Sequence, residues 1–162
     1  MAKWRIAIVV LALGFGQVVM AGQALGADEV PFRGSDVGAF DLPGSCPDGS
    51  LEVVISGTGR ATQLGAYMYT ANECFDPLSG TFGGAPTLTA ANGDTIVGTY
   101  AGQVFATTDP DIITYEEGLA ITGGTGRFAG ATGSLHINGV ANLATLEYTQ
   151  TLIGTVSTPG TS

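Results

Sequence analysis

The chain has 162 residues, of which 14 are acidic and five are basic, and its formal net charge is −9. So acidic a chain is repelled by nucleic acid and by anionic membranes, which excludes both as expected partners. One histidine and two cysteines are too few for a transition-metal site, so we expect no metal.

Residues 1–27 have the layout of a secretory signal peptide. Two basic residues precede an apolar run over residues 6–22, and small residues then offer cleavage after residue 24, 26 or 27. As an uncleaved anchor, the run would be near the short limit for a spanning helix, roughly 17 residues, and it is weakened by glycines. We therefore predict a secreted or periplasmic protein without membrane contact after cleavage.

Cleavage after Ala27 leaves 135 residues with three arginines, no lysine and all fourteen acids, which is a net charge of −11. This length suits one domain with its own core. Cys46 and Cys74 remain as an even pair, which in an exported chain predicts a structural disulfide closing a loop of 28 residues. A redox pair would show C-x-x-C spacing, which the sequence lacks.

Residues 28–49 are rich in turn-forming residues and predict an irregular segment before the domain proper. Beyond them glycines recur, helix formers are scarce, and threonine, valine, isoleucine and tyrosine dominate, which favours strands. The predicted strands are 51–56, 60–71, 86–90, 95–106, 112–122, 134–140 and 143–156. Residues 158–162 are expected to be a flexible tail.

Successive strands joined by tight turns predict an antiparallel meander, and closure into a barrel would remove the exposed edges. We therefore expect an all-β protein with a single antiparallel closed β-barrel of about eight strands over residues 50–157. A barrel of this size holds either packed side chains or one small ligand.

The stretch ITGGTGRFAGATG, residues 121–133, matches the dinucleotide fingerprint G-x-G-x-x-G/A. That fingerprint needs a helix after the loop, whereas three further glycines follow here, each costing a helix about 1 kcal/mol. We interpret the stretch as a turn that bends the sheet, with Phe128 plugging the end of the barrel. The predicted turn residues are Gly123, Gly124, Gly126, Phe128 and Gly130.

The string GGTGRFAGATGS within this region resembles the glycine-rich segment of the allene oxide cyclase-like barrels, a superfamily that includes plant dirigent proteins. It is also similar to small secreted bacterial proteins of this barrel type, whose activity is generally unassigned. The resemblance extends over about residues 51–156 and implies an eight-stranded antiparallel barrel, often in dimers or trimers. It implies either cyclisation of an allene oxide fatty acid or stereoselective guiding of phenoxy radical coupling, neither of which needs a cofactor. The shared string is the turn, so it identifies no catalytic residue.

Glu116 and Glu117 are adjacent in a predicted strand, so their side chains should point to opposite faces of the sheet. A carboxyl group in an apolar lumen would have a raised pKa and could act as an acid or base, which makes the pair our catalytic candidates. In the alternative, the inward glutamate pairs with Arg60 or Arg127, or a bulge exposes both.

Tyrosines within the predicted strands are candidates for lining a ligand cavity, although aromatic clusters of this kind also pack cores and oligomer interfaces. The candidates are Tyr67, Tyr69, Tyr100 and Tyr115. The single histidine, His136, shares a predicted face with Ser134 and Asn138, which favours exposure to solvent.

These observations leave three classes of function open. The first is an exported small barrel that binds one small apolar molecule. The second is a cofactor-free cyclase or isomerase, or a dirigent-like guiding protein, and a lumen with a buried glutamate and tyrosine hydroxyls would favour it. The third is a structural or interaction protein, which a lumen filled by aliphatic side chains would favour.

Overall fold

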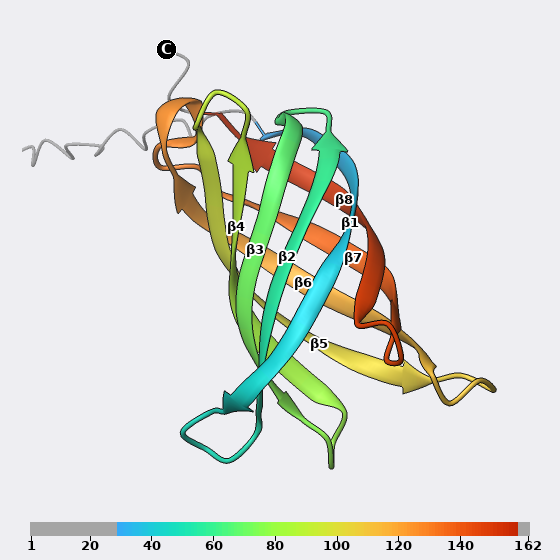
Figure 1. Ribbon diagram of the computed structural model, residues 1–162. Coiled ribbons are helices and arrows are strands. Elements are labelled where there is room, and N and C mark those ends of the chain that lie inside the picture. Colours follow the sequence, from blue (N-terminus) through green and yellow to red (C-terminus); the bar gives the residue numbers. More distant parts are fainter. Residues whose placement is uncertain (1–28, 159–162) are drawn as a thin grey trace, which may run out of the picture.

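The computed structural model describes residues 29–158, and in it each strand pairs with the next along the chain (Figure 1). The strands are β1 Glu29–Ser45, β2 Leu51–Ala61, β3 Gly65–Asp76, β4 Thr81–Ala90, β5 Thr95–Ala106, β6 Ile112–Gly124, β7 Gly133–Asn142 and β8 Glu147–Ser157. The last strand, β8, returns to pair antiparallel with β1. The predicted all-β fold, a closed antiparallel barrel of eight strands, is therefore confirmed.

Both ends of the chain lie outside this description. The predicted signal peptide, residues 1–27, falls outside the described residues, as do residues 159–162 of the predicted tail. Within the described part of the chain, no helix is long and apolar enough to cross a membrane.

The prediction of an irregular segment over residues 28–49 is wrong, because most of it forms the longest strand, β1. Residues facing the lumen from β1 include Phe32, which is fully buried, and Asp36, which is 3 % exposed. Glycines occupy the inward positions between and beyond them, so no alternation of apolar and polar residues is visible in the sequence. The barrel domain therefore begins near residue 29 and not at residue 50.

The prediction of one long strand over residues 60–71 is also wrong, because the chain makes a turn within this range. β2 ends at Ala61 and β3 begins at Gly65, whose φ of +70° is open to glycine but strained for other residues. A similar shift affects the last strand, which begins at Glu147 and not at residue 143. Leu146, in the preceding turn, has a φ of +57°.

Tyrosine rings lie directly against inward-facing glycines of neighbouring strands. A Cβ atom on Gly139 would lie 2.1 Å from Cζ of Tyr115, its partner across the β6–β7 pair. The Tyr148 ring lies across two strands, because a Cβ on Gly38 would be 2.8 Å from its Cε1 and a Cβ on Gly57 would be 2.3 Å from its hydroxyl oxygen. These glycines provide the space that the rings occupy.

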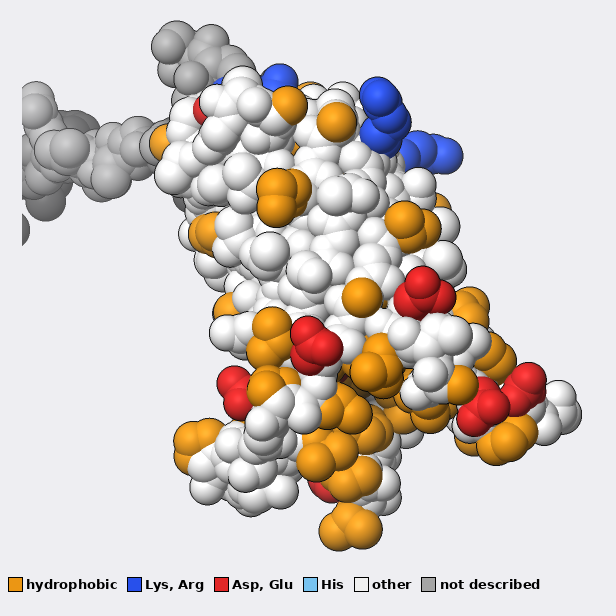
Figure 2. Space-filling model, viewed as in Figure 1, with side chains coloured by type: hydrophobic (Ala, Val, Ile, Leu, Met, Phe, Trp, Pro, Cys, Tyr) orange, Lys and Arg blue, Asp and Glu red, His pale blue; other side chains and the backbone are white. Residues whose placement is uncertain are grey.

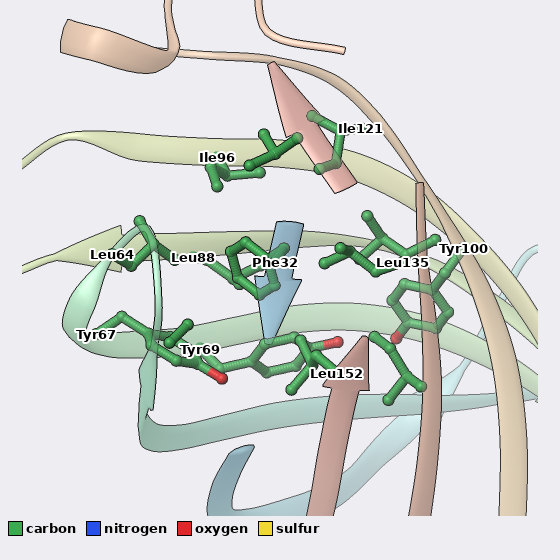
Figure 3. Packing of buried hydrophobic residues seen from close by; sticks show 14 of the residues in the cluster. Phe32, Leu64, Tyr67, Tyr69, Leu88, Ile96, Tyr100, Ile121, Leu135 and Leu152 are labelled. Atoms are coloured by element: carbon green, nitrogen blue, oxygen red, sulfur yellow. The ribbon is translucent and has the colours of Figure 1, made fainter. Parts of the chain in front are cut away.

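One half of the lumen is filled with apolar side chains. Figure 3 shows Phe32 surrounded by Leu88, Leu135 and Leu152, all of which are at most 2 % exposed. A short 3₁₀ helix, η1 (Gly126–Phe128), covers this end, and Phe128 is fully buried in the same cluster.

Polar contacts fasten η1 to the neighbouring turns. Arg127 forms an ion pair with Asp94, with 3.9 Å between Nε and the carboxylate oxygen, and its guanidinium donates to the Gln63 carbonyl. The Thr95 amide donates to the Thr125 hydroxyl at 3.0 Å. The glycine-rich stretch thus forms a turn and a barrel cover, and β7 follows it without an α-helix.

A disulfide joins Cys46 and Cys74 at the opposite end, with 6.0 Å between their Cα atoms. It connects the β1–β2 turn to β3 and encloses β2 within its loop. The predicted pairing is therefore confirmed.

Replacing Gly139 with alanine should lower the free energy of unfolding by about 1–3 kcal/mol, because the added methyl group overlaps the Tyr115 ring. Gly118→Ala is the matched control, since a Cβ at this outward-facing glycine of β6 meets no atom within 4 Å. Alanine there should be neutral or slightly stabilising. Denaturant unfolding followed by circular dichroism measures both variants, and equal destabilisation would contradict the fitted ring.

Candidate ligand pocket

The end of the lumen opposite η1 contains a pocket of about 330 Å³. This volume lies in the range of small-molecule sites, about 300–1,000 Å³. Most of its lining is apolar, with Val53, Phe75 and Val104 among the residues of the wall. Figure 2 shows hydrophobic side chains gathered at this end of the molecule, between the projecting loops.

Glu117 points from β6 into this pocket and is only 5 % exposed. Burial raises the pKa of its carboxyl group to about 8, and the neighbouring carboxyl groups of Glu73 and Asp36 add to the shift. Its Oε1 atom is buried and has no hydrogen-bond partner among the described residues. Glu116, the next residue, lies on the outer face and is exposed. Of the two catalytic candidates, only Glu117 therefore reaches the lumen.

The two arginines considered as partners for the inward glutamate lie elsewhere. Arg60 is exposed on the outer face of β2, and Arg127 pairs with Asp94 at the covered end. The pocket lining contains no arginine, lysine or histidine. The charge of Glu117 is therefore not balanced by a basic side chain of the pocket.

Glu73 is a second carboxyl group in the pocket and is not among the residues predicted from the sequence. It is partly buried and accepts a hydrogen bond of 2.8 Å from the Tyr100 hydroxyl. Burial raises its pKa to about 7, although the hydrogen bond from Tyr100 acts in the opposite direction. A signal was present, because Tyr67, Tyr69 and Glu73 are separated by even numbers of residues and so share one face of β3.

Asp36 is the third inward carboxyl group and lies at the centre of a hydrogen-bonded network. Its Oδ2 atom accepts hydrogen bonds from the Tyr67 hydroxyl at 2.6 Å and from the Gln150 side-chain amide at 3.2 Å. The Tyr115 hydroxyl donates to the same Gln150 side chain at 2.9 Å. Burial raises the pKa of Asp36, whereas its hydrogen bonds from Tyr67 and Gln150 lower it. Asp36 was missed because β1 was not recognised as a strand.

The four candidate tyrosines all face the lumen but have different neighbours. Tyr69 and Tyr115 line the pocket, together with Tyr148, whose ring meets that of Tyr69 edge to face at 6.5 Å between centroids. Tyr67 and Tyr100 instead donate hydrogen bonds to two of the carboxyl groups.

Two further observations define what the site can do. His136 is exposed on the outer face of β7, as its neighbours in the sequence suggest. Within residues 29–158, no group of three or more histidine, cysteine, aspartate or glutamate side chains is arranged to hold a metal ion. The chemistry available in the pocket is that of its carboxyl and hydroxyl groups, which donate a hydrogen bond or proton when protonated and accept one when ionised.

Stability should fall as the pH rises from about 4.5 to about 8. The pKa values of Glu73 and Glu117 rise from 4.5 to about 7 and about 8 on folding, so the folded protein binds protons that the unfolded chain releases. Each group lowers the free energy of unfolding by about 1.4 kcal/mol per pH unit within its own window. Thermal unfolding followed by circular dichroism measures this effect.

Glu117→Gln should reduce the slope between pH 7 and pH 8, where Glu117 contributes more to it than Glu73 does. The exposed neighbour provides a matched control, because Glu116→Gln should leave the slope unchanged. Equal pH profiles for the two variants would show that Glu117 is not protonated by burial.

Comparison of the chain with protein-family models, with curated proteins and with solved structures finds no match. The function of the pocket therefore has to be argued from the residues that line it. These are an apolar wall, three tyrosines, Gln150 and two carboxyl groups of raised pKa.

Proposed function

We propose that the barrel binds one small, mostly apolar molecule in the open half of its lumen, with the polar end of that molecule beside Glu117. The observation that carries this proposal is the combination of an apolar pocket of about 330 Å³ with a buried, unpartnered carboxyl group on its wall. A buried polar atom without a hydrogen bond costs about 1–3 kcal/mol. A ligand that supplies the missing partner would recover that free energy.

The filled half of the barrel supports the same proposal. Phe128, Phe32 and Leu152 are fully buried behind the pocket, so a ligand enters and leaves through one end. Burial of an apolar ligand against the pocket wall contributes about 25 cal/mol for each Å² removed from water. The apolar wall would provide affinity and the polar groups would provide orientation.

A neutral hydrophobic fluorophore, N-phenyl-1-naphthylamine, should bind saturably with increased fluorescence. Ala141→Phe, which adds a ring to the pocket lining, should weaken binding at least about tenfold. Ala101→Phe adds the same ring on the outer face of β5 and should have no effect. Native mass spectrometry of protein from its own exported fraction should show an added mass that is lost on denaturation. Bare subunits together with no binding of the fluorophore would contradict the proposal.

A second candidate function is cofactor-free catalysis, either as a cyclase or isomerase or as a dirigent-like guiding protein. It is favoured by two carboxyl groups, Glu73 and Glu117, with pKa values of about 7 and about 8 in one pocket, since acid–base catalysts operate best near their own pKa. The resemblance of residues 123–134 to the allene oxide cyclase-like barrels is in line with this candidate. Incubating the retained molecule with wild type and Glu117→Gln tests it, because only wild type should yield a new product.

We also propose that the protein is exported, as a secreted or periplasmic protein. The disulfide between Cys46 and Cys74 supports this, since such bonds persist mainly in oxidising compartments. The leader-like composition of residues 1–27 is independent support. The dimer or trimer that the family resemblance implies stays a prediction, and the native masses measure it directly.

Mass spectrometry of the exported protein should show a chain that begins at residue 25, 27 or 28, because the small residues before these positions suit signal peptidase. Alkylation without reductant should modify neither cysteine. A mature chain that still begins at Met1, or one with two free thiols, would contradict export.

A further inference from the structure

We propose that the occupant of the pocket is an amphiphilic organic cation, with an apolar body against the wall and an ammonium group at Glu117 and Glu73. This inference rests on the proposed binding function and adds the chemical class of the ligand. It starts from the charges of the lumen. Three carboxyl groups face inward from three strands, Asp36 from β1, Glu73 from β3 and Glu117 from β6.

No cation of the described chain balances these carboxyl groups. Its basic residues are three arginines and one histidine, and none of them lines the pocket. Arg33, Arg60 and His136 are exposed on the outer face of the barrel, and Arg127 pairs with Asp94 at the covered end. Among the described residues, the one other buried polar group of the lining without a partner is the Tyr148 hydroxyl, which is a neutral donor. When the carboxyl groups are ionised, a charged donor is therefore left to the ligand.

The hydrogen bonds already made in the lumen show where that donor belongs. Asp36 accepts from two side chains through Oδ2, and its Oδ1 atom is buried without a partner among the described residues, but Asp36 does not line the pocket. Glu73 accepts from Tyr100 through Oε2 only. Glu117 accepts from none of the described residues, and its Oε1 atom is fully buried. A primary ammonium group carries three N–H donors and no acceptor, so it has donors to spare for a second carboxyl group of the same pocket.

A neutral or anionic polar group fits this pocket less well. Two carboxyl groups in one pocket repel an anion when they are ionised, and a single hydroxyl donor satisfies only one of them. The rings of Tyr69, Tyr115 and Tyr148 also line the pocket, and the face of an aromatic ring attracts a cation. An ammonium group therefore gains from both the carboxyl groups and the rings.

The loops around the mouth are acidic as well. Asp48, Asp76, Asp109 and Asp111 lie in the turns or strand ends between β1 and β2, β3 and β4, and β5 and β6. Figure 2 shows carboxylates beside the apolar side chains at this end. The negative electrostatic potential of these aspartates would raise the local concentration of cations at the mouth and speed their entry into the pocket.

Binding of a cation should release a proton from the lumen. The carboxyl groups of Glu73 and Asp36 raise the pKa of Glu117. The charge of Glu117 in turn raises the pKa values of Tyr69, Tyr100 and Tyr115. Each of these groups is either neutral or anionic, so none of them supplies a positive charge. Glu117 is therefore largely protonated at neutral pH in the empty pocket, and an ammonium group would convert it to the carboxylate. Affinity for a cation should rise about tenfold per pH unit below the pKa of Glu117.

Three probes of equal chain length test the proposal, namely octylammonium, octanol and octanoate, each competing with N-phenyl-1-naphthylamine at pH 8. We expect octylammonium to bind at least about tenfold more tightly than octanol, and octanoate to bind most weakly. Glu117→Gln should reduce the affinity for octylammonium about tenfold and leave octanol unchanged. Glu116→Gln, on the outer face, should change neither.

The outcomes separate the two proposals. Octanol binding as tightly as octylammonium would overturn the cationic ligand and leave apolar binding standing. Displacement by none of the probes, together with no binding of the fluorophore, would overturn both. If Glu117→Gln fails to fold, calorimetry of the wild type in two buffers of different ionisation enthalpy measures the protons released on binding. We expect proton release when octylammonium binds and none when octanol binds. Equal proton release with both probes would overturn the proposal.

Discussion

Space inside an eight-stranded barrel is scarce, because inward side chains from all strands share one narrow lumen. Here the packing of tyrosine rings against glycines determines which part of the lumen is filled and which part stays open. Tyr115 lies against Gly139, and Tyr148 lies across Gly38 and Gly57, so both rings occupy the wall and not the centre. The open half of the lumen depends on this arrangement, since a side chain at Gly57 or Gly139 would collide first with a tyrosine ring, and one at Gly38 would collide with the backbone of β2 as well as with the ring.

The polar groups of the lumen depend on the same division. Aliphatic and phenylalanine side chains fill the covered half, and the hydrogen bonds of Asp36 with Tyr67 and Gln150 lie within the barrel. Beyond them, carboxyl groups face the pocket with raised pKa values, which lowers the stability of the fold near neutral pH. The disulfide opposes that loss, because closing a loop of 28 residues contributes about 3–4 kcal/mol in the chain-entropy account.

The fold class could be predicted from the sequence because glycines and β-branched residues exclude helices over most of the chain. β1 could not, since its inward positions alternate large side chains with glycines and hide the period of two. Adjacent glutamates predict one inward carboxyl group, but their faces exchange if the register slips by one residue, so only the structure identifies Glu117 as the inward one. Glu73 was missed because the predicted strand ended two residues before it.

The cover formed by η1 and Phe128 makes the barrel a cup and not a tube. A molecule that binds head first has its charged end at depth and its tail directed toward the mouth. Tail length is then unrestricted by any far wall, and a long tail would extend past the rim, where Leu42 and Leu78 are exposed. Such a cup would discriminate between ligands by their head group and by the width of their tail. Molecules that differ only in tail length would therefore bind with similar affinity.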